Sequence, residues 1–322
     1  MIEEPAEEIL EELDGSGRGS KAKLILPWAF AAVVITYLLW YVPLDEVAAA
    51  ISEAEVGWFL PLIMGSVVYW FLLDSLAYSY LISRFNAPLS WQEARGMRGV
   101  TYWVAALNWN AGTAAIILYL HRLKQVRPLE STSSVMFYTM FDAVILAGFA
   151  FVGALFLPSG TLMTTVLAVS ASFIAGSALF FWLVVSDRPS WLWLKGVRAW
   201  SVFSSHRKAQ PRDFLVLLVI RSSYLTGFVA CFLFGASTFE ISVPIGLGLA
   251  SVPVIMMMGA VPISPAGLGT QAAAMLFFWS DAGEAASIVA YGLVFPVALT
   301  LARVILGTPY MREFKMLTSG KR

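Results

Sequence analysis

The sequence predicts an all-α polytopic membrane protein with about six full spans and two re-entrant or broken helical segments in an inverted repeat. Of its 322 residues, 59% are hydrophobic and 13% are charged, whereas soluble domains are about 45–50% apolar and about 25% charged. Apolar stretches of about 20 residues, enough helix to cross a bilayer core about 30 Å thick, recur along the chain. Two further apolar stretches are interrupted by residues that end helices.

Six stretches fit a complete crossing. They are Leu24–Val42, Gly57–Ser83, Ser131–Leu157, Thr161–Ser186, Asp213–Gly235 and Ala286–Gly307. We expect them to form one transmembrane domain over residues 23–308, preceded by an acidic tail over 1–22 and followed by a basic tail over 309–322. Within this domain, residues 187–212 are predicted to be a basic loop at the membrane interface, because tryptophans alternate there with lysines and arginines.

The two interrupted stretches are Gly99–Leu120 and Ser242–Ser280. The first contains Asn108-Trp109-Asn110-Ala111-Gly112-Thr113, and the second contains V-P-I-S-P-A-G-L-G-T-Q over Val261–Gln271. Proline removes a backbone donor, and glycine adopts angles that end a helix. A helix that breaks at membrane depth must lie inside protein or line a wet cavity. We expect both stretches to be re-entrant, although 39 residues would also let Ser242–Ser280 cross twice.

The charges fix an orientation under this interpretation. With both stretches re-entrant, 19 of the 21 lysines and arginines fall on one side of the membrane. The opposite loops contain only acidic charges: Asp45, Glu46, Glu53, Glu55, Glu240, Asp281 and Glu284. Because basic loops stay in the cytoplasm, we expect a multi-pass protein of the cytoplasmic (inner) cell membrane with both termini in the cytoplasm. The order span, re-entrant loop, span then occurs twice with opposite orientation, as in many transporters.

Four ionisable residues lie inside predicted spans. They are Asp74, Asp142, Arg221 and Arg303. Such a residue costs roughly 2.5–3.5 kcal/mol on insertion scales unless it is paired or hydrated. We therefore expect the four to line a polar path that holds a phosphate headgroup, with Asp142 and Arg221 as the stronger candidates. The alternative is a structural salt bridge, with Arg303 reaching the cytoplasmic face.

The two breaks predict a second set of polar contacts. A helix that begins near Gly269 would direct free amide groups and its positive dipole end into the protein, where an anion would be favoured. The candidates at the breaks are Asn108, Asn110, Gly112, Thr113, Pro262, Pro265, Gly267, Gly269 and Gln271. The alternative is that the small residues allow tight helix packing.

Other chemistry has little support in the sequence. No zinc cluster, Walker loop, H-E-x-x-H or G-x-S-x-G motif is present, so we expect no cofactor, no metal and no catalytic residue. The histidines, His121 and His206, adjoin basic residues and are expected to be solvated or interfacial. Membrane lipids are the expected partners and nucleic acid is not; a homo-oligomer is left open.

The residues around both breaks resemble a known family. L-N-W-N-A-G-T near position 110, Asp142 in the next helix and P-I-S-P-A-G-L-G-T-Q are similar to the flippase-like transmembrane domain of lysylphosphatidylglycerol synthases. Pro262, Pro265, Gly267 and Gly269 match its second motif, whereas Thr113 and Gln271 stand where that family carries glutamates. Before Asp142, the resemblance implies a Glu-Arg pair where this sequence has Tyr138-Thr139. The resemblance implies a polytopic fold with two re-entrant segments that moves aminoacylated phospholipids or polyprenyl-linked glycolipids between leaflets. We expect no synthase domain, so lipid lysinylation is not implied.

The leading hypothesis is a lipid flippase or transporter. It would move a phosphate-bearing lipid headgroup, of a phospholipid or a polyprenyl-linked lipid, across the cytoplasmic membrane. Two alternatives stay open: a membrane enzyme acting on a lipid or polyprenyl phosphate, with Glu93, Glu130 and His121 near the headgroup plane, and a non-transporting membrane partner subunit. The sequence does not give the lipid, the direction or the source of energy.

Overall fold

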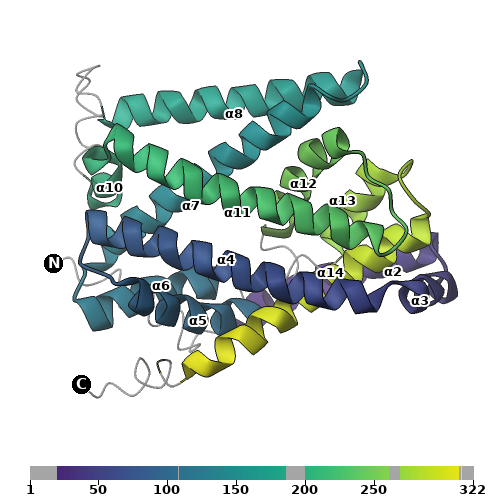
Figure 1. The fold of residues 1–322 in the computed structure, drawn as a ribbon, viewed down its shortest axis with the longest axis horizontal. Coiled ribbons are helices and arrows are strands. Elements are labelled where there is room, and N and C mark those ends of the chain that lie inside the picture. Colours follow the sequence, from purple (N-terminus) through teal and green to yellow (C-terminus); the bar gives the residue numbers. More distant parts are fainter. Residues whose placement is uncertain (1–19, 108, 186–199, 261–268, 312, 314–322) are drawn as a thin grey trace.

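The protein is a bundle of helices, most of them roughly antiparallel (Figure 1). The computed structural model describes residues 20–107, 109–185, 200–260, 269–311 and 313, and these residues contain no strand. Five helices among them are long and apolar enough to cross a membrane, or six if one bent pair counts as a single span. The all-α polytopic membrane fold is therefore confirmed.

The helix bounds agree with the predicted spans to within a few residues. The helices are α2 (Ser20–Tyr41), α3 (Leu44–Glu53), α4 (Val56–Phe85), α5 (Trp91–Leu107), α6 (Trp109–Lys124), α7 (Pro128–Ala154), α8 (Thr161–Val185), α10 (Ser204–Lys208), α11 (Pro211–Ser237), α12 (Ile245–Ala260), α13 (Thr270–Trp279) and α14 (Ala285–Gly307). Short 3₁₀ turns η1 (Ser201–Phe203) and η3 (Thr308–Tyr310) complete the set. The bent pair is α2 and α3, which meet at 89°; the sequence analysis did not predict α3.

Helices α5 and α6 form the first re-entrant hairpin. They have 17 and 16 residues, roughly 25 Å each at about 1.5 Å per residue, which is short of a core about 30 Å thick. Lys124 at the end of α6 binds Glu93 in the first turn of α5 across 2.6 Å. Both open ends of the hairpin therefore lie at the same side, as predicted.

Helices α12 and α13 form the second hairpin. The 10 residues of α13 span roughly 15 Å, about half of the bilayer core, so this segment does not cross twice. Its open ends are joined because the amide of Ser242 donates to the carbonyl of Ala282 at 2.8 Å. Inside the hairpin, Trp279 Nε1 donates to Ser251 Oγ at 2.9 Å. The short length of α13 thus favours re-entry over two crossings.

The hairpins open at opposite ends of the bundle. At the basic end, Arg84 near the end of α4 pairs with Asp213 near the start of α11 at 3.1 Å; Glu93 and Lys124 belong to this end. At the acidic end, the amide of Glu55 donates to the carbonyl of Thr238 at 3.0 Å, and Ser242 and Ala282 lie nearby in the chain. The order helix, hairpin, helix therefore occurs twice in opposite senses: α4, α5–α6, α7 and then α11, α12–α13, α14.

One prediction about the basic loop is wrong. His206 on α10 is fully buried, at 0% exposure, and its ring lies 5.2–6.1 Å from those of four phenylalanines on three segments: Phe137, Phe180, Phe181 and Phe203. Burial, followed by the charge of Arg207, lowers the pKa of His206 from 6.5 to about 4. His206 is thus neutral and internal rather than solvated. His121 is exposed, as predicted.

Candidate functional site

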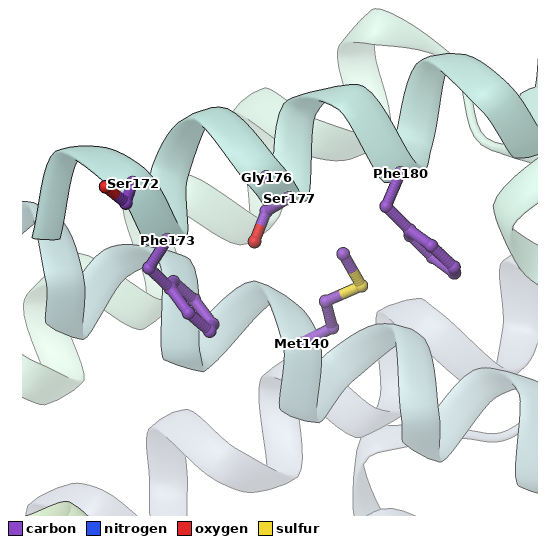
Figure 2. A pocket seen from close by; sticks show the side chains of 6 residues that line it. All are labelled: Met140, Ser172, Phe173, Gly176, Ser177 and Phe180. Atoms are coloured by element: carbon purple, nitrogen blue, oxygen red, sulfur yellow. The ribbon is translucent and has the colours of Figure 1, made fainter. Parts of the chain in front are cut away.

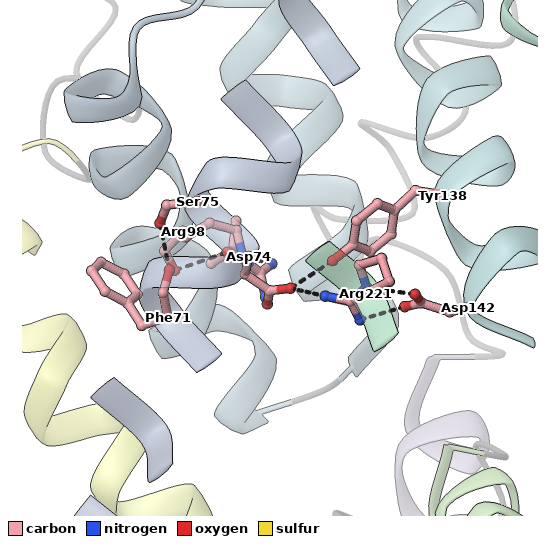
Figure 3. A network of polar contacts seen from close by, with 8 residues as sticks. Phe71, Asp74, Ser75, Arg98, Tyr138, Asp142 and Arg221 are labelled. Atoms are coloured by element: carbon pink, nitrogen blue, oxygen red, sulfur yellow. Dashed lines mark hydrogen bonds and ion pairs between the residues drawn. The ribbon is translucent and has the colours of Figure 1, made fainter. Parts of the chain in front are cut away.

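Arg221 on α11 joins two aspartates from two other helices. Its Nε and Nη2 each lie 2.6 Å from one carboxylate oxygen of Asp142 on α7. Its Nη1 lies 2.5 Å from Oδ1 of Asp74 on α4. Figure 3 shows the guanidinium between the two carboxylates. The structure therefore brings together three of the four intramembrane charges that the sequence singled out.

A second arginine, which the sequence analysis missed, completes the arrangement. Arg98 Nη2 on α5 lies 2.6 Å from Oδ2 of Asp74, and the Tyr138 hydroxyl donates to Oδ1 of Asp74 at 2.5 Å. The charge pattern of the sequence counts Arg98 among the 19 basic residues on one side of the membrane, but its side chain is only 12% exposed. We call Asp74, Arg98, Tyr138, Asp142 and Arg221 the Arg221 network.

Tyrosine rings surround the arginines of the network. Their faces lie 4.0–5.2 Å from a guanidinium carbon: Tyr224 and Tyr138 beside Arg221, and Tyr102 and Tyr78 beside Arg98. Arg303 on α14 lies 5.7 Å from the centre of the Tyr102 ring, so the fourth predicted charge adjoins the network. Cation–π contacts of this kind stabilise desolvated arginines by about 2 kcal/mol or more each.

The network is closed in this conformation. The side chains of Arg221 and Asp74 are 4% and 5% exposed, whereas that of Asp142 is 20% exposed. Within the network itself, two arginines, Arg98 and Arg221, are matched by two aspartates, Asp74 and Asp142. A buried charge is costly unless it is paired, so each arginine requires an anionic partner at this site.

The candidates at the first break lie mainly in helix rather than in a loop. Asn110, Gly112 and Thr113 belong to α6, and Asn108 lies outside the described residues. A Cβ on Gly112 would come within 2.7 Å of the Ala105 Cβ on α5. Gly112 is therefore required for close packing of the first hairpin, which is the small-residue alternative from the sequence.

At the second break, a helix starts where it was predicted. Gly269 precedes α13 with φ +82°, a left-handed angle that side chains rarely tolerate. Gln271 lies in the first turn of α13, and a Cβ on Gly269 would lie 3.2 Å from side-chain atoms of Val34 and Ile35 on α2. Pro262, Pro265 and Gly267 lie outside the described residues.

The match to known families covers both hairpins and the whole network. A family model described as the lysylphosphatidylglycerol synthase TM region matches residues 24–307. The chain belongs to this family. No curated protein matches the sequence. The membership and the apolar helices establish a multi-pass membrane protein linked to lipid handling.

Within this lysylphosphatidylglycerol synthase TM family, the chain differs at the network itself. Tyr138 and Thr139 stand where the family pattern described above has a Glu-Arg pair. Here the Tyr138 hydroxyl occupies one oxygen of Asp74, and Arg98 occupies the other. Neutral Tyr138 and Thr139 thus stand at two charged positions of the pattern, while Asp142 is retained.

Two apolar grooves lie apart from the network. One, of about 430 Å³, lies between α7 and α8 and is lined by Met140, Ser172, Phe173, Gly176, Ser177 and Phe180 (Figure 2). The other, of about 460 Å³, lies between α3, α4 and α14. Neither lining includes a network residue. Their apolar walls are suited to hydrocarbon chains, whereas the charged side chains of the Arg221 network are buried between helices.

Two of the three residues considered for an enzyme, Glu93 and His121, contact other groups of the protein. The Lys124 ammonium, followed by the Ser90 amide, holds the pKa of Glu93 below its usual range. One ring nitrogen of His121 lies 3.1 Å from the Val126 carbonyl. Among the described residues, no group of three His, Cys, Asp or Glu could hold a metal ion.

Proposed function

We propose that this protein is a lipid flippase or transporter that moves a phosphate-bearing lipid headgroup across the cytoplasmic membrane. The single observation that carries the proposal is Arg221, which lies 2.5–2.6 Å from carboxylates of two other helices in the middle of the apolar bundle. Intramembrane ionisable groups are costly and typically mark substrate pathways. Phospholipids and polyprenyl-linked lipids both carry the phosphate that an arginine recognises.

The arrangement of helices supports a path through the network. Asp74, Arg98, Asp142 and Arg221 come from four different helices, so a modest separation of α4, α7 and α11 would open the site without unfolding any of them. The closed state then corresponds to an occluded stage of transport. Lipid tails would remain in the bilayer, next to the apolar grooves, while the headgroup passes the arginines.

The charge distribution supports an orientation and a class of activity. Because the loops at one end are basic and those at the other are acidic, the basic end would face the cytoplasm, together with both termini. The proposed action is transport rather than catalysis, with membrane lipids as the partners. The groups of the network that could act as nucleophile or base, Asp74, Tyr138 and Asp142, are each bonded to another network residue, which favours transport over group transfer.

A translocation assay in reconstituted vesicles tests the proposal. A phospholipid with a fluorescent headgroup is placed in both leaflets, and a membrane-impermeant quencher reports how fast the inner pool appears outside. We expect vesicles with the wild-type protein to exceed empty vesicles, and Arg221→Gln to reduce the protein-dependent rate at least about tenfold. The matched control is Arg84→Gln, which breaks another arginine–aspartate pair between α4 and α11 at the basic end.

Three outcomes would count against the proposal. Equal translocation rates for Arg221→Gln and wild type would show that the headgroup does not pass the Arg221 network. Formation of a new lipid product by the purified protein alone would favour the enzyme alternative. Empty-vesicle rates with every lipid phosphate tested would favour a non-transporting membrane partner subunit, for which the closed network is only structural.

A further inference from the structure

The contact between Arg221 and Asp142 has the shape in which a guanidinium binds a phosphodiester. The Nε and Nη2 atoms each bond a different carboxylate oxygen, both at 2.6 Å. A phosphodiester offers two non-bridging oxygens that accept the same parallel pair of N–H groups. The Asp142 carboxylate therefore occupies the edge of Arg221 that such a phosphate would use.

Asp142 is also the aspartate that can leave. Asp74 is held by three groups, from Arg98, Arg221 and Tyr138. Among the described residues, the hydrogen bonds to the Asp142 carboxylate come from Arg221 alone. The Asp142 side chain is 20% exposed against 5% for Asp74, so Asp142 is the more accessible of the two, while Asp74 anchors Arg221.

The charges of the cluster favour one kind of headgroup. Replacing Asp142 at Arg221 by a group of charge −1 leaves the balance around that arginine unchanged. A phosphomonoester carries about −1.5 to −2 near neutral pH, which would overcompensate it. A zwitterionic headgroup would bring an ammonium beside Arg98 and Arg221, and like charges in a desolvated site repel strongly.

We propose that Asp142 is a tethered substitute for the ligand, and that the site selects a singly charged phosphodiester, which displaces Asp142 from Nε and Nη2 of Arg221. This inference rests on the proposed function and specifies its substrate class. The exchange makes and breaks only hydrogen bonds and ion pairs. Asp142 is a specificity-determining residue in this scheme, and Asp74 holds the arginine in place.

Lipid retention by the purified full-length protein tests the exchange. The protein in neutral detergent is mixed with equal amounts of phosphatidylglycerol, phosphatidylcholine and phosphatidic acid, and bound lipid is counted by mass spectrometry. These probes are a phosphodiester of charge −1, a zwitterionic phosphodiester and a phosphomonoester. We expect wild-type protein to retain phosphatidylglycerol roughly tenfold over the other two, which is the ratio that one charge-assisted contact provides.

Three variants then separate the geometry from the charge. Asp142→Asn removes the competing anion and is expected to raise phosphatidylglycerol retention roughly tenfold. Asp213→Asn removes a carboxylate from the Arg84 pair on the same bundle and is expected to leave retention unchanged. Arg221→Lys keeps the positive charge but loses the parallel pair of donors, so the preference for phosphatidylglycerol should disappear.

Other results would overturn the inference. Equal retention of the three lipids by wild-type protein excludes the charge selection, without any need for a variant to fold. An equal increase in Asp142→Asn and Asp213→Asn would mean that general charge, rather than the Arg221 edge, governs binding. Translocation of all three lipids at one rate would overturn this inference and leave the proposed transport standing. Selective retention of phosphatidylglycerol without translocation would support this inference and overturn the proposed transport.

Discussion

The open ends of the two hairpins are joined by different kinds of contact. The open end of the first is joined by an ion pair between Glu93 and Lys124, and its α5 helix contributes Arg98 to the buried network. The second contains no charged residue in α12 or α13. Its open end is joined by a backbone hydrogen bond from Ser242, and its interior by the bond from Trp279 to Ser251.

The two hairpins therefore differ in how they are coupled to the rest of the bundle. The first hairpin places a charge beside Asp74 and Arg221, so its position is coupled electrostatically to whatever occupies the network. The second is held by neutral contacts and close packing: a Cβ on Gly292 of α14 would lie 2.5 Å from the Ala272 Cα on α13. Charge-changing substitutions should therefore act mainly through the first hairpin, whereas the second, whose two helices contain no charged residue, should respond to changes of volume and of neutral hydrogen bonds.

The largest effect is expected from removing the anchor of the first hairpin. Asp74→Ala leaves Arg98 and Arg221 without the carboxylate they share, and losing one partner of a buried ion pair costs about 3–5 kcal/mol. Unfolding in mixed detergent micelles should show this loss. Ser75→Ala is the control, because Ser75 is buried on the same turn but bonds only a backbone carbonyl in its own helix. Equal losses in both variants would contradict the electrostatic role.

A smaller effect is expected where the second hairpin meets α14. Gly292→Ala places a methyl group against backbone of α13, and overpacking of this kind costs about 1–3 kcal/mol. In the same unfolding assay, Gly148→Ala should be neutral or stabilising, since nothing lies within 4 Å of a Cβ at that position. A neutral Gly292→Ala would show that the second hairpin is not tightly packed there.

The neutral bond inside the second hairpin gives a third prediction. Ser251→Ala leaves the buried Trp279 Nε1 without its acceptor, which costs about 1–2 kcal/mol. Because neither group titrates, the loss should be the same at about pH 7 and about pH 5. A strong pH dependence of the loss in stability caused by Ser251→Ala would contradict the conclusion that neutral contacts hold the second hairpin.

The smallest effect is expected at the exposed ion pair of the first hairpin. Bonding to Lys124 and to the Ser90 amide lowers the pKa of Glu93 in the folded state below 4.5, so this pair contributes stability above the unfolded-state value and loses it as pH falls through the folded-state value. Glu93→Gln should cost at most about 1 kcal/mol near pH 7. The difference from wild type in melting temperature should shrink toward about pH 4; a difference that grows on acidification would contradict this assignment.

The sequence predicted the parts of the fold that depend on local composition. Apolar length located the five long spans, and proline and glycine located the helix start at Gly269. Asp74, Asp142 and Arg221 were found because a charge inside an apolar stretch is costly wherever it pairs.

The missed features depend on contacts between distant segments. Arg98 resembles other basic loop residues until the first hairpin folds against α4, and His206 is buried by phenylalanines of α7 and α8. One signal was available: Ser90 and Glu93 form a capping box, with the Ser90 amide 2.8 Å from a Glu93 carboxylate oxygen. That pattern would have started α5 at Trp91 and placed Arg98 in the hairpin.

The most direct test of the central claim is to ask which part of a lipid touches the network. A photoreactive p-azidophenylalanine replaces Tyr138, whose hydroxyl contacts Asp74, or Phe277, which is 73% exposed on α13. Vesicle lipids carry a tag either on the headgroup or at the end of a tail. We predict that position 138 captures the headgroup tag and position 277 the tail tag. Capture of neither tag at position 138, with normal translocation, would contradict a headgroup path through the Arg221 network.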